Sequence, residues 1–169
     1  KKDFIKIKNS ECITLHYFYN ELFVNYILQN ISNFITSKQY LEYKENNYHN
    51  YLVKTIKSGY DTKYVYTINE KVGFKNYTNW RDIFVKNYIP YFLKNPDKTN
   101  QLLEFIIEKL DFYVDMLKFY NKALHFNHTD LKLENVFVRE TNNTVEKPFI
   151  HNYDILLSDL DKSNLKINN

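Results

Sequence analysis

Apolar and polar residues recur along the chain with two different periods, which predict both strands and helices. Residues 3–8 alternate with a period of two, typical of a half-buried strand. Over residues 14–30 the spacing becomes that of an amphipathic helix, and a longer helix is predicted over residues 101–125. We expect the first helix to bury Leu15, Phe18, Leu22, Tyr26 and Ile27. We expect the second to bury Leu103, Ile106, Leu110, Val114, Leu117, Tyr120 and Leu124.

Turn-forming residues divide the rest of the chain. Residues 32–50 are polar and irregular, which predicts a loop holding a short helix. Two strand-like runs, 51–57 and 62–68, flank a turn at 58–61 and predict a β-hairpin. A second hairpin is predicted from 135–139 and 153–158, around a turn at 141–144.

A linker and a further helix complete the pattern. Residues 69–79 contain Gly73 and show no clear period, which indicates a linker. Asn79 is a good N-cap for a helix that starts at Trp80, and Pro90 is expected to kink or end that helix. The order of elements predicts an α+β fold.

Composition narrows the class of protein. A chain of 169 residues makes one domain or two small lobes, and 44% hydrophobic residues exclude a disordered chain. No apolar run reaches the roughly 20 residues of a membrane span, and no signal segment is recognisable, so we expect an intracellular, cytoplasmic protein. The net charge of +3 is spread without a compact basic block, so nucleic-acid binding is not expected. The single Cys12 excludes a disulfide framework.

The strongest chemical signal lies in residues 128–135, which read His-x-Asp-Leu-Lys-x-x-Asn. Phosphoryl transfer needs a carboxylate near the acceptor hydroxyl, a cation on the moving group and an amide oxygen on magnesium. Asp130, Lys132 and Asn135 supply these three groups in that order. The alternative interpretation is a surface turn with incidental charges.

This stretch resembles the catalytic loop of the protein kinases, and Lys132 makes it similar to the Ser/Thr type. The resemblance implies that Asp130 orients the acceptor hydroxyl, that Lys132 contacts the γ-phosphate and that Asn135 binds Mg²⁺. His128 matches the histidine of the family's loop. Thr129 stands where the family usually has Arg, which argues against activation through a phosphate on the activation loop.

A second patch resembles the kinase Asp-Phe-Gly motif. An apolar run over residues 155–157 leads to Asp159-Leu160-Asp161, and the resemblance implies that Asp159 holds Mg²⁺. Asp161 replaces the glycine, a departure similar to the acidic variants of small-molecule kinases. The alternative is a solvated acidic turn that ends a strand.

Nucleotide-binding positions are implied more weakly. Kinases pair a strand lysine with a helix glutamate to position the α- and β-phosphates, and Lys6 with Glu21 resembles this pair. Lys8 is the rival to Lys6. The hinge that would receive adenine through its backbone is expected near Asn69 and Glu70. Only two glycines occur, so no glycine-rich phosphate loop is present.

The resemblance implies an incomplete two-lobed, protein kinase-like fold. Residues 1–68 would be part of the N-lobe, 69–79 the hinge, and 80–169 part of the C-lobe with the catalytic loop. The implied activity is ATP- and Mg²⁺-dependent transfer of the γ-phosphate to a hydroxyl of a protein or small molecule. The chain starts Lys1-Lys2 without Met, so we expect a segment of a longer protein whose activity in isolation is doubtful. A pseudokinase or interaction module, or a kinase of lipids or sugars, remains an alternative.

Overall fold

The chain has a mixed α+β fold with small antiparallel sheets. The computed structural model describes residues 4–6, 12–60, 65–73, 76–141 and 153–167. Among these residues the strands form three two-stranded sheets. The pairs are β1 (Phe4–Lys6) with β2 (Cys12–Thr14), β3 (Thr55–Tyr60) with β4 (Val65–Asn69), and β5 (Val136–Glu140) with β6 (Tyr153–Leu157).

Helices and tight helical turns connect these strands. The α-helices are α1 (Leu15–Gln29), α2 (Ser37–Glu45), α3 (Trp80–Ile83), α4 (Ile89–Lys94) and α5 (Thr99–Leu124). The shorter turns are η1 (Ile31–Asn33), η2 (Tyr48–Asn50), the π-helical η3 (Phe84–Tyr88), η4 (Pro96–Lys98) and η5 (Leu133–Asn135).

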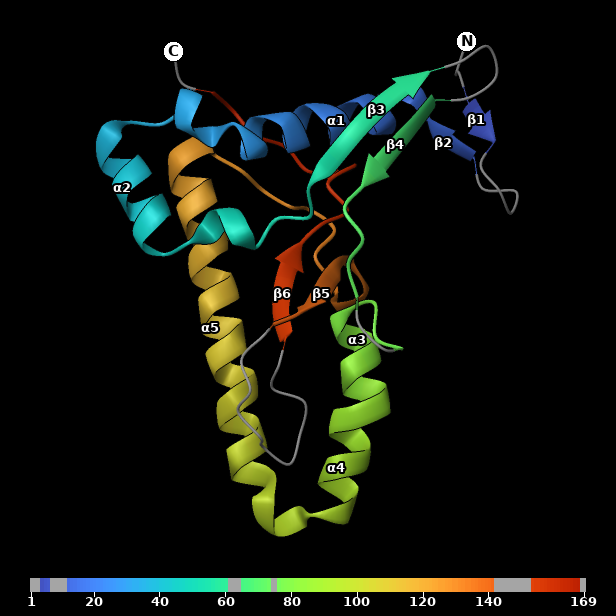
Figure 1. Ribbon diagram of the computed structural model, residues 1–169, viewed down its shortest axis with the longest axis vertical. Coiled ribbons are helices and arrows are strands. Elements are labelled where there is room, and N and C mark those ends of the chain that lie inside the picture. The colour runs from blue at the N-terminus through green and yellow to red at the C-terminus, as the bar shows by residue number, and fades with distance from the viewer. Residues whose placement is uncertain (1–3, 7–11, 61–64, 74–75, 142–152, 168–169) are drawn as a thin grey trace.

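The β5–β6 hairpin occupies the middle of the molecule. Figure 1 shows α5 along one side of this hairpin, α3 and α4 along the other, and α1 crossing above it next to β3 and β4. Residues 51–53 run beside β6, because Val53 N–H donates to Leu157 O (3.0 Å) and Leu157 N–H donates to Tyr51 O (2.7 Å). Gly73, whose φ of 89° favours glycine, donates its N–H to Val138 O (2.7 Å). These hydrogen bonds join residues 51–53 and Gly73 to the β5–β6 hairpin.

The predicted first helix is confirmed as α1, but the predicted buried face is wrong at Tyr26. This side chain is 60% exposed, whereas Val24, Ile27 and Leu28 are buried. Apolar residues occupy most of the circumference of α1, so the sequence allows more than one buried stripe. The face that packs inward places Asn25 in the interior in place of Tyr26.

The long helix is confirmed as α5, and the predicted stripe is correct at Tyr120 and Leu124, partly correct at Ile106 and Leu117, and wrong at three positions. Leu103, Leu110 and Val114 are each at least 40% exposed. The buried side chains of α5 are Leu102, Tyr113, Met116, Phe119, Tyr120 and Leu124. Two apolar stripes run along this helix, and the one with the larger rings faces the core, where Phe119 contacts Tyr48 with 5.2 Å between ring centroids.

Both predicted hairpins are confirmed, but the bounds of the first are wrong, because β3 begins at Thr55 and residues 51–54 precede it. Ser58, Gly59 and Tyr60 belong to β3 and not to the turn. Gly59 lies under the ring of Tyr66 on β4, where a Cβ would come within 2.6 Å of the Tyr66 hydroxyl, so the glycine permits close packing across the strands. Of the two predicted turns, residues 61 and 142–144 lie outside the described residues.

The helix predicted to start at Trp80 begins there as α3, and the chain remains helical past Pro90. The Asn79 side chain caps α3 by accepting from Asp82 N–H (3.0 Å). Of the two outcomes predicted at Pro90, a kink or an end, the end is wrong, because the chain remains helical to Lys94. The wider π turn η3 precedes Pro90 and relieves the clash that proline causes with the preceding turn.

Buried aromatic side chains hold the start of β6 in place. Trp80 donates its indole N–H to the hydroxyl of Tyr153 (3.0 Å), which is also hydrogen-bonded to the hydroxyl of Tyr88. All three side chains are at most 2% exposed. Because Tyr153 begins β6, this network sets the path of the strand that ends at Ser158 and Asp159.

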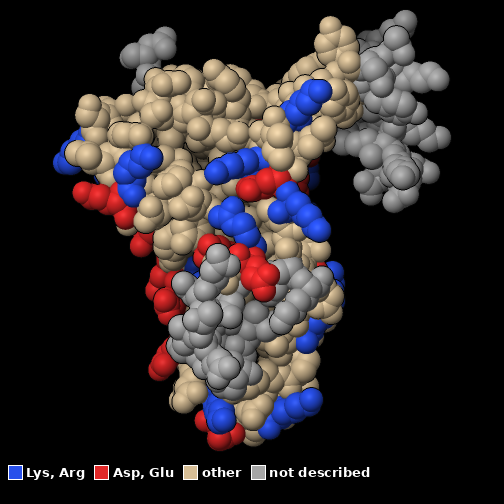
Figure 2. Space-filling model, viewed as in Figure 1, with Lys and Arg blue, Asp and Glu red and all other residues tan. Residues whose placement is uncertain are grey.

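The surface carries mixed charge. Figure 2 shows lysine and arginine side chains interspersed with acidic ones on the face viewed. None of the helices in the described part of the chain is long and apolar enough to cross a membrane.

Candidate functional site

The predicted catalytic-type loop is tied to the segment that follows β6. Asn127 and Asn164 exchange two backbone hydrogen bonds of 2.9 Å each. His128 is buried and donates from Nε2 to Ser158 O (2.7 Å), while Ser163 Oγ donates to His128 O (3.2 Å). We call residues 127–135 and 158–164 together the loop wall, because these contacts make them one unit.

Thr129 adds a further tie at a strained backbone position. Its φ of 57° lies in the left-handed region, which β-branched residues rarely adopt. The Thr129 hydroxyl donates to Lys162 O (2.6 Å) and so helps to hold this conformation. An uncharged side chain thus links the loop to the next segment where kinases usually have Arg.

Asp130 lies between two lysines at the surface of the loop wall. Its Oδ2 is 2.7 Å from Lys162 Nζ and 3.4 Å from Lys132 Nζ. These contacts, first the hydrogen bond from Lys162 and then that from Lys132, hold the pKa of Asp130 below its ordinary value. The carboxylate is therefore ionised at neutral pH and suited to orienting a hydroxyl group. Lys162 is a residue that sequence reasoning missed.

One end of the Asn135 side-chain amide is occupied by a hydrogen bond within the protein. The side chain is buried, and its Nδ2 donates to Asp130 O (3.0 Å). Ser158 Oγ donates to the backbone carbonyl of Asn135 (2.6 Å), which joins the loop to the end of β6. The Oδ1 of Asn135 is thereby left as the oxygen that can serve a ligand or a metal ion.

Asp159 follows Ser158 in an unusual backbone conformation. Its φ of 55° is left-handed, which turns the chain sharply at the end of β6. Burial, followed by the charge of Asp161, raises the pKa of Asp159 above its ordinary value. Its carboxylate is therefore a group that a cation would stabilise.

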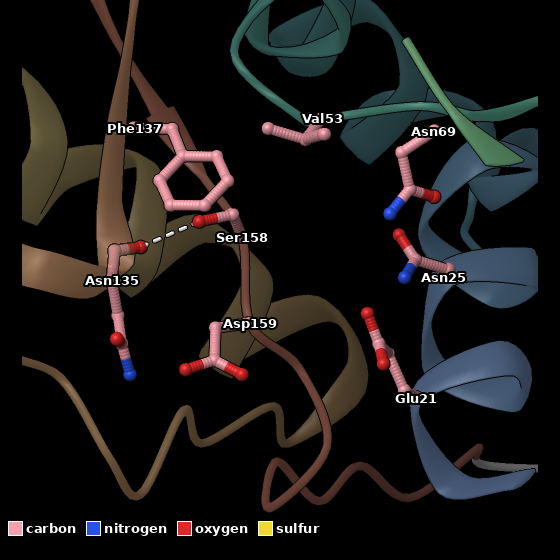
Figure 3. Close-up of a pocket in the computed structure, with 8 residues that line it drawn as sticks. All are labelled: Glu21, Asn25, Val53, Asn69, Asn135, Phe137, Ser158 and Asp159. Carbon is pink, nitrogen blue, oxygen red and sulfur yellow. Dashed lines mark hydrogen bonds between the residues drawn. The ribbon is translucent and has the colours of Figure 1, made fainter. Parts of the chain in front are cut away.

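A cavity of about 200 Å³ lies between the loop wall and α1. Asn135, Ser158 and Asp159 line it on one side, and Figure 3 shows Glu21 and Asn25 reaching in from α1 on the other. The remaining lining residues are Val53, Asn69 and Phe137. We call Glu21 and Asn25 of α1, together with the neighbouring Asn69 at the end of β4, the helix wall. The predicted residues Asn135, Asp159, Glu21 and Asn69 thus meet in one place.

Glu21 faces a concentration of negative charge. Burial, then the charges of Asp159 and Asp161, raises its pKa from 4.5 to about 7. The neighbouring Asn20 connects α1 to the same segment, since its Nδ2 donates to Asp161 O (2.9 Å) and to Ser163 O (2.7 Å). Helix α1 therefore places the carboxyl group of Glu21 close to those of Asp159 and Asp161.

The donor set fits magnesium when phosphate completes it. Among the residues that the structure describes, no group of three or more His, Cys, Asp or Glu side chains could hold a metal ion. Mg²⁺ is usually bound through one or two carboxylates together with substrate phosphates. Asp159 and the Oδ1 of Asn135 are hard oxygen donors of this kind on one cavity. They would hold Mg²⁺ together with a bound phosphate.

The predicted nucleotide-positioning lysine is not placed. Lys6 lies in β1 opposite Cys12, but its side chain, like the whole of Lys8, lies outside the described residues. A Lys6–Glu21 pair therefore stays a prediction.

The two predicted hinge residues differ in their surroundings. Asn69 lines the cavity, whereas Glu70 points elsewhere. The Glu70 N–H donates to Lys54 O (2.8 Å), its Oε1 accepts from Lys54 N–H (3.0 Å), and its Oε2 lies 3.6 Å from Arg139. Glu70 thus fastens the end of β4, and its N–H is already bonded within the protein.

The sequence did not point to the polar side chains Asn25, Ser158 and Lys162, nor to the apolar lining residues Val53 and Phe137. Asn25 follows Glu21 by one helical turn, a spacing that puts both on one face and could have suggested it. Ser158 and Lys162 flank the Asp159 motif, but nothing in their identity distinguishes them from surface residues.

Comparison with known proteins adds no relative. Neither a protein-family model, nor a curated protein, nor a solved structure matches this chain. The geometry of the cavity and of the loop wall is therefore what bears on function.

Proposed function

We propose that the chain forms part of an ATP- and Mg²⁺-dependent phosphotransferase related to the protein kinases, of Ser/Thr type, with the cavity between two lobes. One observation carries this proposal. Asn135 and Asp159, 24 positions apart, line the same cavity, and Asn135 is hydrogen-bonded to the backbone of Asp130. This arrangement supports the proposal, because the carboxylate and the two oxygen donors assigned to Mg²⁺ belong to neighbouring segments of the loop wall.

In this mechanism the protein positions reactants and offsets charge. Asp130 accepts a hydrogen bond from the acceptor hydroxyl and aligns it with the γ-phosphorus. Lys132 and Lys162, which pair with Asp130, would supply positive charge to the moving phosphoryl group. Mg²⁺, when bound, supplies positive charge to the phosphate oxygens. Asn135 and Asp159 would hold the ion through their side-chain oxygens, and the hydrogen bond from Ser158 to the Asn135 carbonyl keeps Asn135 in place.

The acceptor is a hydroxyl group of a protein or of a small molecule. One observation favours the small-molecule alternative, including lipids and sugars. Asp161 stands where protein kinases have glycine, and its Oδ1 is buried without a hydrogen-bond partner among the described residues. A buried oxygen without a donor is unfavourable, and a polar group of a small-molecule acceptor would supply one.

Transfer of labelled γ-phosphate tests the activity. The full chain is incubated with ATP and Mg²⁺ in the presence of a Ser/Thr-rich protein or a panel of sugars and lipid alcohols. We expect Mg²⁺-dependent transfer that Asp130→Ala lowers by roughly 10²–10⁴-fold, the usual contribution of a positioned acid–base group. Asp97→Ala, an exposed acid far from the cavity in sequence, is the matched control and should transfer like the wild type.

Two results would count against the proposal. Transfer that survives Asp130→Ala undiminished would remove its assigned role. A wild type that binds Mg-ATP but transfers nothing to any acceptor or to water would make the chain a pseudokinase or interaction module.

A further inference from the structure

Asn25 is a buried amide whose oxygen has no partner. The side chain lies on α1 and is 6% exposed, and its Oδ1 meets no hydrogen-bond donor among the described residues. It lines the same cavity as Asp159, and Figure 3 shows it beside Glu21 on the helix wall. A buried amide oxygen without a donor is unfavourable, whereas an apolar side chain of similar size would avoid the loss.

The neighbouring Asn69 limits what can satisfy this oxygen. Thr55 Oγ1 donates to Asn69 Oδ1 (2.9 Å), which engages that end of the amide. Figure 3 shows its Nδ2 end turned toward Asn25, yet the two groups do not form a hydrogen bond. Asn25 Oδ1 is therefore buried at the edge of the cavity without a donor among the described residues.

The cavity has two chemically different ends. Glu21, Asn135 and Asp159 make one end rich in oxygen donors to a metal ion, while Asn25 and Asn69 make the other end amide-lined. Phosphate groups carry only acceptors at neutral pH, so they cannot donate to Asn25. A nucleotide whose phosphates lie at the metal-binding end would carry its base toward the amide-lined end, where an exocyclic amino group of the base can donate to Asn25.

We propose that Asn25 Oδ1 accepts a hydrogen bond from the exocyclic amino group of the nucleotide base, and so selects an amino-bearing purine. This inference rests on the proposed function, since it assigns the base end of the same site. Asn69 is the residue that keeps Asn25 in position by packing next to it.

Binding of two nucleotides separates this role from a structural one. The probes are Mg-ATP and the Mg complex of purine riboside triphosphate, which lacks the amino group and is otherwise the same. We expect the wild type to bind ATP about 3–10-fold more tightly, the value of one hydrogen bond. In Asn25→Leu this ratio should fall to about 1. Gln29→Leu, an exposed change on the same helix, should keep the wild-type ratio.

Thermal unfolding without nucleotide shows whether Asn25→Leu folds. Because the substitution removes an unpaired buried oxygen, we expect a melting temperature equal to or above that of the wild type. Asn25→Ala serves as a second variant if leucine does not fit, with the same expected loss of selectivity.

The outcomes distinguish the two proposals. A wild type that binds neither nucleotide refutes the proposed function. A wild type that binds both equally, or an Asn25→Leu protein that keeps the preference, refutes the role of Asn25. A large loss of stability in both Asn25 variants and in Asn69→Ala, with unchanged selectivity, would show that Asn25 and Asn69 pair with each other.

Discussion

The two walls of the cavity are built in opposite ways. In the loop wall, His128, Ser158 and Asn135 are bonded to backbone atoms of neighbouring segments. In the helix wall, Glu21 has a raised pKa and Asn25 has an unpaired oxygen. The loop wall is thus held in place by its own hydrogen bonds before any ligand arrives, although His128 Nδ1 and Asp161 Oδ1 are buried without a partner among the described residues. In the helix wall the unfavourable groups are Glu21 and Asn25, which a ligand would stabilise. We infer that the loop wall fixes the geometry of the site and that the helix wall supplies selectivity for the ligand.

The largest effect on stability is expected when the loop wall loses His128. His128→Ala removes a buried ring and leaves the carbonyl of Ser158 without its donor. We expect a loss of about 2–4 kcal/mol in the free energy of unfolding, from the cavity and the unpaired carbonyl together. Denaturant unfolding measures it, and His16→Ala, at an exposed position, should change it by less than ~0.5 kcal/mol. Equal effects of the two substitutions would contradict a loop wall fixed by His128.

The next effect concerns the helix wall and depends on pH. Folding raises the pKa of Glu21 from 4.5 to about 7, so between these values the folded state binds more protons than the unfolded state. Its contribution to stability is therefore lost as the pH rises through this window. Glu21→Gln should be more stable than the wild type at pH ~8, by at most ~3 kcal/mol, and should differ little at pH ~4.

Paired denaturant curves at several pH values, without Mg²⁺ or nucleotide, provide this test. Glu104→Gln, at an exposed position on α5, is the control and should follow the wild type at every pH. A difference between Glu21→Gln and wild type that stays constant with pH would show that Glu21 is not buried among acids.

The smallest effect is expected at the contact between the walls. Asn20→Ala removes both hydrogen bonds from α1 to Asp161 and Ser163. Each such bond is worth about 0.5–1.5 kcal/mol, so a loss of roughly 1–2 kcal/mol is expected. Asn100→Ala, at an exposed position on α5, is the control. A loss above that of His128→Ala would mean that the walls are not separately stabilised.

The contrast between the walls also explains what the sequence could reveal. Asp130, Lys132 and Asn135 lie within one short loop, so their order alone indicated their shared chemistry. Asp159 was recognisable because an apolar strand ends in front of it. The hairpins, the N-cap at Asn79 and the existence of α1 and α5 followed from local patterns, which need no knowledge of distant partners.

The helix wall was harder because it depends on tertiary packing. Which stripe of α1 faces inward decides whether Asn25 or Tyr26 reaches the interior, and both choices fit a helical period. On α5 the bulk of Tyr113 and Phe119 prevailed over the aliphatic stripe that includes Leu110, a competition that depends on the shape of the core. Lys162 meets Asp130 only through the turn at Asp159, which sequence spacing does not reveal.

Stabilisation by Mg-ATP is the most direct test of the central claim, that Asp159 and Asn135 hold Mg²⁺ beside a bound nucleotide. At ATP concentrations ~100-fold above the dissociation constant we expect about 2.7 kcal/mol of stabilisation and a melting temperature higher by roughly 5–10 °C. The increase should require Mg²⁺, disappear in Asp159→Asn and persist in the control Asp115→Asn. No increase in the wild type, or an equal increase in Asp159→Asn, would contradict the account.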